Sequence, residues 1–358
     1  MAEKPQPLRI LAVSALWQGA NDYAYVRAFQ RLGHSVSVVS SDRFVPDWQG
    51  RSLRAVRRLL MPKIVAEFNS ALLAQAQATK PDLLFVFKGA YVKPETIAAI
   101  KSGGVVAINF FPDTGFADHG PYLPKAIGLY DWVFTTKTAG VADLAARYGC
   151  RNAGFVAHSF DPEVHAPLQL SSDDLERYAC DVSFIGNISK KKCQTLQHVA
   201  RRLPDLKLFI WGAAKWGQVP DLAHWFQGRA VWGHEYSKAI QASSINLGLL
   251  FEGGPSAPAG DQITSRTFHI PACGGFMLHE RTEEALGFFK EGQESAFYGD
   301  ADELVAQISH YLDHPALRAR IARAGYNRAL SSGYSVDVRV QQVLDTYREL
   351  LGAMPLSR

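Results

Sequence analysis

Short apolar runs alternate with longer segments of helical periodicity along the whole chain. The runs are rich in Val, Ile, Leu and Phe and are bounded by polar or glycine-containing turns, which is typical of buried strands. The segments between them repeat apolar residues every three or four positions, as amphipathic helices do. Strands separated by helices of this length form βαβ units and a parallel sheet. In the first half the predicted strands are 8–15, 34–40, 82–88, 104–111, 131–136 and 152–158, and the predicted helices are 22–33, 62–80, 94–102 and 139–149.

The alternation stops at residues 159–179, which contain two prolines and a polar run, and then it restarts. The pattern therefore predicts an α/β protein with two Rossmann-like, doubly wound parallel-sheet domains, residues 1–158 and 180–333, joined by 159–179 as a linker. The final segment, 334–358, has helical spacing and is long enough to pack back on the first domain. Two such domains would face a central cleft at the carboxyl ends of their strands, where open α/β sheets bind ligands. The predicted strands of the second half are 180–186, 206–212, 230–233, 244–250 and 274–279.

The composition indicates a soluble globular protein, with 47% hydrophobic and 20% charged residues. A formal net charge of +4 over 358 residues is small for a nucleic-acid-binding protein but suits anionic small ligands. No apolar run reaches the ~18 residues of a membrane span, and the N-terminus does not read as a secretory signal. We therefore expect a cytoplasmic protein without nucleic-acid partners. Its four cysteines lack the paired spacing of a zinc site, so we expect reduced thiols and no metal: Cys150, Cys180, Cys193 and Cys273.

The segment SRTFHIPACGGFML (265–278) predicts the first turns of a helix, a Cys-Gly-Gly stop and a buried strand. Ser265, Arg266 and Thr267 open this helix, where exposed N–H groups and the positive end of the helix dipole attract anions. Arg266 adds a planar guanidinium suited to a phosphate. The alternative is an ordinary N-cap at Ser265 beside a solvated arginine. His269 follows between apolar residues, so it is either a core histidine bonded to a backbone carbonyl or a residue that faces a ligand.

A second candidate lies at the start of the second domain. Gly186 and Asn187 follow a buried strand and precede a predicted helix, where a glycine lets the backbone approach a ligand. Ser189 is the expected N-cap of that helix. Lys190 begins a run of three lysines that adds positive charge beside the predicted cleft, or else forms a solvated surface.

Three stretches resemble the CgeB-like branch of the group 1 glycosyltransferases: FIGNISKKK (184–192), GHEYSKAIQASSINLGL (233–249) and 265–278. Residues 283–330 are similar to it too, whereas the first half matches only in outline. The resemblance implies the GT-B fold, with a nucleotide-sugar donor such as a UDP-sugar bound mainly by the second domain and an acceptor bound by the first. It also implies metal-independent chemistry, with no cofactor besides the nucleotide sugar.

The resemblance assigns further donor contacts. In similar enzymes the ends of two strands hold the base, which corresponds here to Trp211, Gly212 and Tyr236. Either aromatic ring could stack on the base or belong to the core. The loop 252–264, rich in Gly and Pro, is either a flap that orders on binding or a mobile surface loop.

Group 1 enzymes carry two acidic residues eight positions apart, the first meeting the donor sugar and the second the ribose. The matching positions here are Asp261 and His269. A carboxylate would form charge-assisted hydrogen bonds of about 1.5–3 kcal/mol each, whereas a neutral imidazole can satisfy one hydroxyl at about 0.5–1.5 kcal/mol. We therefore expect weaker donor binding, or compensation by other residues.

The first domain supplies the predicted catalytic residues. Asp113 lies just beyond the strand 104–111, so it should face the cleft. An inverting transferase needs a base that takes the acceptor's proton, and Asp113 is the first candidate, followed by His119 and Asp22. Asp22 is alternatively the cap of the helix 22–33, and a retaining enzyme would need no such base.

The segment GRSLRAVRRLLMPK (50–63) places arginines among apolar residues. A basic amphipathic helix of this kind can lie on an anionic membrane, which would bring the protein to the inner face of the membrane. A basic edge for an anionic acceptor and a solvated helix face are the alternatives.

The function expected from these features is a hexosyltransferase-type glycosyltransferase that moves a sugar from a nucleotide diphosphate to a glycan, a lipid-linked saccharide or a protein. A nucleotide-sugar epimerase on the same fold is an alternative, because fold does not fix reaction. A degenerate protein that binds a ligand or partner without turnover is another, given the departure at His269. A dinucleotide oxidoreductase is disfavoured, because neither half has GxGxxG after its first strand.

Overall fold

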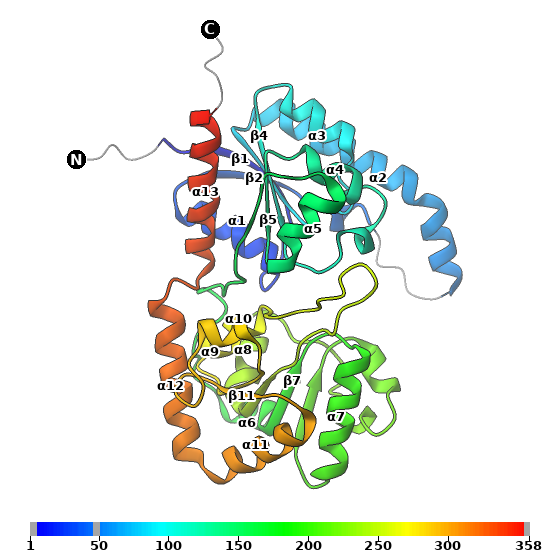
Figure 1. Cartoon of the computed structure of the whole chain (residues 1–358). Coiled ribbons are helices and arrows are strands. Elements are labelled where there is room, and N and C mark those ends of the chain that lie inside the picture. Colours follow the sequence, from blue (N-terminus) through cyan, green and yellow to red (C-terminus); the bar gives the residue numbers. More distant parts are fainter. Residues whose placement is uncertain (1–5, 46–50, 354–358) are drawn as a thin grey trace, which may run out of the picture. The chain divides into compact units, whose positions relative to one another are not determined.

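The computed structural model describes residues 6–45 and 51–353, which form two compact units (Figure 1). The first unit comprises the described residues up to Ala157 together with those from Asp337 onward, and the second runs from His158 to Val336. Each unit is built on one parallel sheet, so the predicted fold class of two doubly wound α/β domains is confirmed.

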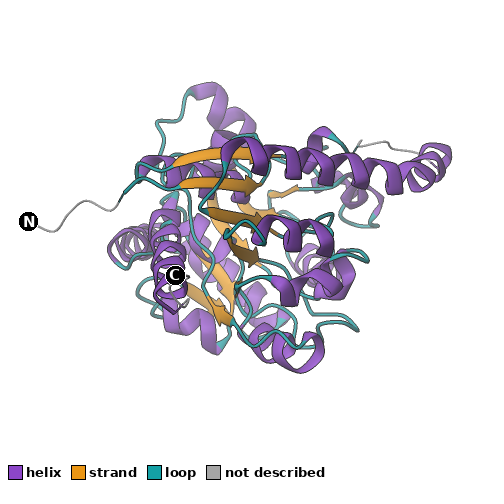
Figure 2. Ribbon diagram, turned by 90° about the horizontal axis from the view of Figure 1, so that it is seen from above, coloured by secondary structure: helices purple, strands orange, loops and turns teal. Residues whose placement is uncertain are grey.

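The first unit has a six-stranded sheet in the order β2-β1-β3-β4-β5-β6. Every residue of β3 and β4 is buried, because helices cover both faces of the sheet (Figure 2). This explains why these strands read as continuous apolar runs rather than alternating ones. The strands are β1 (Arg9–Val13), β2 (Ser35–Val39), β3 (Leu83–Phe87), β4 (Val106–Phe111), β5 (Trp132–Thr135) and β6 (Ala153–Phe155).

Different helices fill the two faces of this sheet. On one face Phe68 and Leu72 of α2 pack with Leu84 of β3 in an apolar cluster. On the other face Tyr25 of α1 stacks on Phe85, with ring centroids 5.7 Å apart. The helices that precede the second unit are α1 (Asn21–Arg31), α2 (Arg51–Thr79), α3 (Pro94–Lys101), α4 (Leu123–Ala126) and α5 (Thr138–Tyr148), with short 3-10 turns at Ser41–Arg43, Phe116–His119 and Ile127–Leu129.

The last helix, α13 (Val336–Ala353), adds to the first unit after the chain has passed through the second. Asp337 pairs with Arg31 of α1, with Oδ1 and Nη2 2.7 Å apart. The apolar residues Val340, Val343 and Leu344 are buried. The helical spacing of the sequence thus marks the face of α13 that packs inward.

The second unit has a five-stranded parallel sheet in the order β11-β10-β9-β7-β8. Its strands are β7 (Cys180–Ile185), β8 (Leu208–Trp211), β9 (Ser243–Gly248), β10 (Met277–Glu280) and β11 (Ala296–Tyr298). Its helices are α6 (Ser172–Tyr178), α7 (Lys190–Arg202), α8 (Gly233–Ala242), α9 (Arg266–Ala272), α10 (Glu283–Phe288), α11 (Ala301–Asp313) and α12 (Pro315–Ser331), with 3-10 turns at Ala214–Gln218 and Ala223–Trp225.

Three predicted elements differ from the structure. The segment 159–179 folds with the second unit, where Phe160 bridges Ser335 and α6 forms. The helix predicted over 62–80 begins at 51 and continues through Pro62, which is exposed, so that water can satisfy the carbonyl that it leaves unpaired. No strand forms over 230–233, where Arg229 instead makes two hydrogen bonds of 2.7 Å to Glu235 in the first turn of α8.

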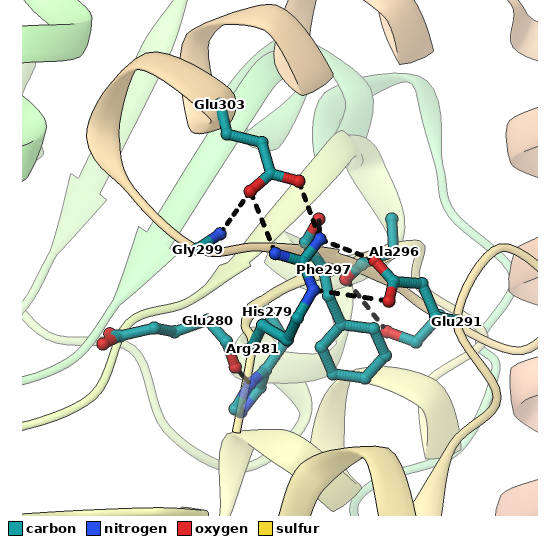
Figure 3. Close-up of polar contacts among 9 residues, drawn as sticks. His279, Glu280, Arg281, Glu291, Ala296, Phe297, Gly299 and Glu303 are labelled. Carbon is teal, nitrogen blue, oxygen red and sulfur yellow. Dashed lines mark hydrogen bonds and ion pairs between the residues drawn. The ribbon is translucent and has the colours of Figure 1, made fainter. Parts of the chain in front are cut away.

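Arg281 ties together three elements at the carboxyl edge of the second sheet (Figure 3). It directly follows β10, and its Nη2 lies 2.7 Å from a carboxylate oxygen of Glu291 and 2.7 Å from one of Glu303 in α11. Glu303 also accepts the N–H of Gly299, just after β11, at 2.6 Å. Arg281 is the main reason that the pKa of Glu303 is lowered to about 2. This network fixes the end of β10, and with it the adjacent residue Glu280.

Replacing Glu303→Gln should lower the free energy of unfolding at pH 7 by about 1 kcal/mol, because a partly exposed ion pair is screened by solvent. The pKa of Glu303 falls from 4.5 to about 2 on folding, so the stabilisation is present above pH 4.5 and is lost as the pH falls toward 2. Urea denaturation at pH 7 and pH 3 should show a smaller difference between wild type and variant at pH 3. An unchanged difference would contradict this, and exposed Glu176→Gln is the control.

Candidate functional site

Arg266 lies at the centre of the strongest candidate site, at the carboxyl edge of the second sheet. It is the first residue of α9, and its Nη2 donates to the carbonyl oxygen of Leu249, just after β9, at 2.7 Å. Its Nη1 donates to the carbonyl of Ile185, the last residue of β7, at 3.4 Å. The Nε of Arg266 is buried without a hydrogen-bond partner in the part of the chain that the structure describes. A cation with unused donor capacity therefore lies between two strand ends.

The predicted glycines of this edge are required by close packing. A Cβ on Gly186 would lie 2.8 Å from Nη1 of Arg266 and 2.9 Å from the Phe184 ring. A Cβ on Gly212 would lie 2.4 Å from the carbonyl oxygen of Gly186, which also accepts the indole N–H of Trp216 at 3.0 Å. Gly186 brings backbone close to the guanidinium, as the sequence suggested for a ligand-binding loop, and Gly212 packs against Gly186. Their contact with a donor stays a prediction.

The N-terminus of α7 already holds an anion from the protein itself. Ser189 caps the helix, as predicted, by accepting the N–H of Lys192. Its hydroxyl donates to one carboxylate oxygen of Glu252 at 2.6 Å, and the N–H of Lys191 donates to the other at 3.1 Å. Glu252 thus occupies the position at which a helix terminus would bind a ligand's phosphate. Asn187, between these groups, is exposed.

The three lysines of this helix have different environments. Lys190, the predicted contact, is exposed, and Lys191 pairs with Glu280. Lys192 is buried, and its ammonium donates to the carbonyl of Asn187 at 3.4 Å. Burial, followed by the charge of Arg266, lowers the pKa of Lys192 to about 8. The sequence reasoning placed Lys192 in the charged run but named Lys190 as the contact, although the spacing of Lys192 with the buried residues Leu196 and Val199 marks the inward face of α7.

The first residues of α9 are bonded within the protein. Ser265 occupies the N-cap position, but its side chain makes no capping hydrogen bond. Thr267 is buried, and its hydroxyl accepts the N–H of Thr264 at 3.1 Å and lies 2.9 Å from Nε2 of His279. The predicted anion contact at this helix start therefore depends mainly on the Arg266 side chain.

His269 is buried in a cluster of aromatic rings. Its Nε2 donates to the carbonyl oxygen of Ser159 at 3.0 Å, and its ring stacks on that of His165 with centroids 3.7 Å apart. Burial is the main cause that lowers the pKa of His269 to about 3, so the ring is neutral. This is the arrangement of a core histidine bonded to a backbone carbonyl. A ribose contact, which stays a prediction, would have to use Nδ1.

The two aromatic rings predicted to stack on a base also pack inside the unit. Trp211 is 3% exposed and lies against Tyr178, with ring centroids 5.7 Å apart. Tyr236 is 8% exposed and lies edge-on to His269. Little ring surface remains open for a base in this structure. The buried hydroxyl of Tyr236 has no partner among the described residues.

Asp261 ends the loop that contains Glu252. The loop forms no helix or regular strand, as its composition predicts, and it closes on itself through the N–H of Asp261 and the carbonyl of Phe251, 2.9 Å apart. Gly253 and Gly260 have positive φ angles of 94° and 64°, which only glycine adopts readily. The charge of Asp261 supports protonation of Lys192, so this carboxylate belongs to the same electrostatic site.

The first unit has its own polar cluster at the carboxyl ends of its strands. Asp113, just beyond β4, pairs with Nζ of Lys88 at 2.8 Å and lies 3.7 Å from Nε2 of His119. Lys88 directly follows β3 and has a φ of 61°, a strained value for a residue with a side chain. The sequence reasoning missed Lys88, although it is the polar residue that ends a fully apolar strand.

Asp22 joins this cluster through its charge. It lies in the first turn of α1, whose N-cap is Ala20, so it is not the cap itself. Its carboxylate accepts the N–H of Ala15 at 2.6 Å. Burial raises the pKa of Asp22, and the nearby charge of Lys88 opposes that rise. The three predicted catalytic residues therefore share one sheet edge with Lys88.

Residues 190–345 match a protein-family model described as glycosyl transferase-like. No curated protein sequence matches the chain. Within the described residues, no group of three or more metal-ligating side chains occurs.

Solved structures match nearly the whole chain. A glycosyltransferase from Rickettsia africae is similar with a TM-score of 0.66 and 13% identity, over 98% of this chain and 100% of that one. Sucrose-phosphate synthase from Thermosynechococcus elongatus gives 0.67 and 15%, over 98% and 100%. The Anabaena protein HepE in complex with UDP-glucose gives 0.62 and 13%, over 96% and 100%. These likenesses establish the fold, which is the GT-B fold that the resemblance implied.

The variant Gly212→Ala should lose about 1–3 kcal/mol of folding free energy, because its methyl group would collide with the Gly186 carbonyl. Gly287→Ala in α10 is the matched control, since a Cβ there meets nothing within 4 Å. That control should be neutral or slightly stabilising, by up to about 1 kcal/mol. Thermal and urea denaturation of both variants measures the difference, and equal stabilities would contradict the packing argument.

Proposed function

We propose that this protein is a metal-independent glycosyltransferase that takes a sugar from a nucleotide-diphosphate donor and passes it to an acceptor bound by the first unit. The glycosyl transferase-like match covers most of the second unit. Among the proteins with similar folds, one is a glycosyltransferase and another was solved with UDP-glucose. The CgeB-like branch is the proposed subfamily, on the residues that carry the resemblance.

The observation that carries the proposal is the pair of buried cations at the edge of the second sheet. The charge of Arg266 lowers the pKa of Lys192 after burial does, so the two cations lie close enough to repel each other. The charges of Asp261, Glu252 and Glu280 act on this pKa in the opposite direction. No carboxylate forms an ion pair with Arg266 among the described residues, and its Nε is unpaired. A diphosphate would relieve this repulsion and take the unused donors. In glycosyl transfer the same contacts stabilise the charge that develops on the leaving diphosphate.

Glu252 sets a condition on donor binding. Its carboxylate occupies the N-terminus of α7, where the loop at Gly186 was expected to hold phosphate. We propose that the diphosphate contacts Arg266 and Lys192 first and that Glu252 leaves α7 when the loop 252–264 reorganises around the donor. Asp261 would then meet the sugar hydroxyls.

The acceptor side offers two carboxylates for an inverting reaction. Asp113 already pairs with Lys88, whereas Asp22 is partly buried and its raised pKa makes it a stronger base than a solvated carboxylate. We therefore place Asp22 ahead of Asp113 as the base that takes the acceptor's proton. His119 would position Asp113.

Arg266→Ala should weaken binding of the preferred nucleoside diphosphate by about 10- to 100-fold, the range for hydrogen bonds to a charged group. His269→Ala should change the affinity by less than about threefold, because its Nε2 is bonded to Ser159. Calorimetry with UDP, GDP, ADP and their sugars measures both effects. Arg266→Lys keeps the positive charge without the planar guanidinium, so it separates a loss of binding from a loss of folding. Exposed Arg201→Ala is the control.

Each result has a definite reading. Equal large losses in Arg266→Ala and His269→Ala would place His269 on the ribose and contradict the core arrangement. Absence of binding to every nucleotide would overturn the proposed function. Release of an altered sugar nucleotide without any acceptor would favour an epimerase instead.

Nucleoside diphosphate affinity should fall as the pH rises above about 8, because Lys192 has its pKa lowered to about 8 and loses its charge there. Binding of the anion favours the protonated lysine, so the loss should approach tenfold per pH unit well above that value. In Lys192→Met this pH dependence should disappear, and the affinity at pH 7 should already be low. Exposed Lys215→Met is the control, and an identical pH profile in wild type and Lys192→Met would contradict the assignment.

A further inference from the structure

The long helix α2 is partnered along only part of its length. Its later turns pack on the sheet of the first unit, where Val65, Phe68 and Leu72 are at most 2% exposed. Its earlier turns extend beyond the edge of that sheet (Figures 1 and 2). Of the predicted segment 50–63, Gly50 lies outside the described residues, and the side chains are described from residue 56 onward.

The apolar face of α2 changes sides along the helix. Val56, Leu59 and Leu60 are 45%, 80% and 37% exposed. At about 100° per residue, these three residues point roughly half a turn away from Val65, Phe68 and Leu72, which face the core. A helix that served only its own core would keep one apolar face along its whole length. Packing within the first unit therefore does not explain why the apolar side chains at 56–60 point outward.

Basic residues accompany this outward apolar face. Arg57 is partly exposed at its edge, and the side chain of Lys63 is 78% exposed one turn further on, with its Nζ 3.9 Å from Oε1 of Glu67. Exposed Arg58 lies on the opposite side of the helix. No acidic residue occurs between positions 51 and 66, and Glu67 is the first. Exposed Leu and Val side chains beside arginine and lysine are the combination with which interfacial helices bind anionic lipid.

We propose that residues 56–63 of α2 dock on an anionic membrane surface. Val56, Leu59 and Leu60 enter the boundary between headgroups and acyl chains, while Arg57 and Lys63 contact lipid phosphates. No helix among the described residues is long and apolar enough to cross a membrane. A second copy of this chain is disfavoured as the occupant, because a two-fold contact would bring the same cations together. The docking does not depend on the proposed function.

Flotation of the full chain with lipid vesicles tests the proposal. The protein should bind phosphatidylcholine vesicles that contain phosphatidylglycerol, should not bind pure phosphatidylcholine vesicles, and should bind less as the salt concentration rises. Leu59→Ser should weaken binding about tenfold, and Arg57→Gln with Lys63→Gln should weaken it by at least about tenfold. Leu330→Ser is the matched control, since Leu330 is an exposed leucine, at 51%, in the second unit.

The opposite results are equally definite. No binding to anionic vesicles overturns the proposal, as does binding that Leu59→Ser and the double variant of Arg57 and Lys63 leave unchanged. A dimer that Leu59→Ser dissociates, without vesicle binding by the wild type, would show that a second copy covers this face. Circular dichroism and thermal unfolding should be the same for all variants, because every substituted side chain is at least partly exposed.

Discussion

The buried guanidinium of Arg266 organises the carboxyl edge of the second sheet. It bonds to carbonyl oxygens at the ends of two neighbouring strands, β7 and β9. Its presence excludes a side chain at position 186, and the carbonyl of Gly186 in turn excludes one at position 212. A buried charge destabilises a fold unless it is paired or hydrogen-bonded. The glycines, the start of α7 and Lys192 are arranged around a buried cation that carbonyl oxygens solvate and that the charge of Asp261 helps to keep protonated.

The two units carry different chemistry at equivalent places. In the first unit the strand ends bring carboxylates, an imidazole and one lysine together, which are groups that can move a proton or hold one in place. In the second unit the strand ends bring cations together, which stabilise a departing anion. Both clusters follow from one geometric rule, since the carboxyl ends of parallel strands meet at a single edge of each sheet. An inverting group transfer with a phosphate leaving group uses both kinds of site.

Local patterns predicted every strand of the described residues except β11, which has only three residues, because a buried parallel strand is a continuous apolar run. The polar residue that follows such a run marks the strand's end. The same patterns could not show directly which of the three adjacent lysines is buried. Only the spacing of Lys192 with Leu196 and Val199 indicates that it lies on the inward face of α7. They also could not identify the partner of His269. Ser159 lies 110 positions away, and the stacked His165 comes from a segment whose prolines suggested a linker. Contacts of that range depend on tertiary packing, which periodicity does not encode.

The place of α13 in the chain has a consequence for how the protein is made. During synthesis, all six strands of the first unit emerge before the second unit begins, yet the helix that buries Val340, Val343 and Leu344 emerges after the second unit is complete. The surface that α13 covers, including Arg31, is thus exposed on the ribosome while about half of the chain is translated. Domains generally fold in the order in which they emerge. Here the first unit begins first but is completed last, because it needs α13. The second unit can complete its core as soon as its own residues have emerged.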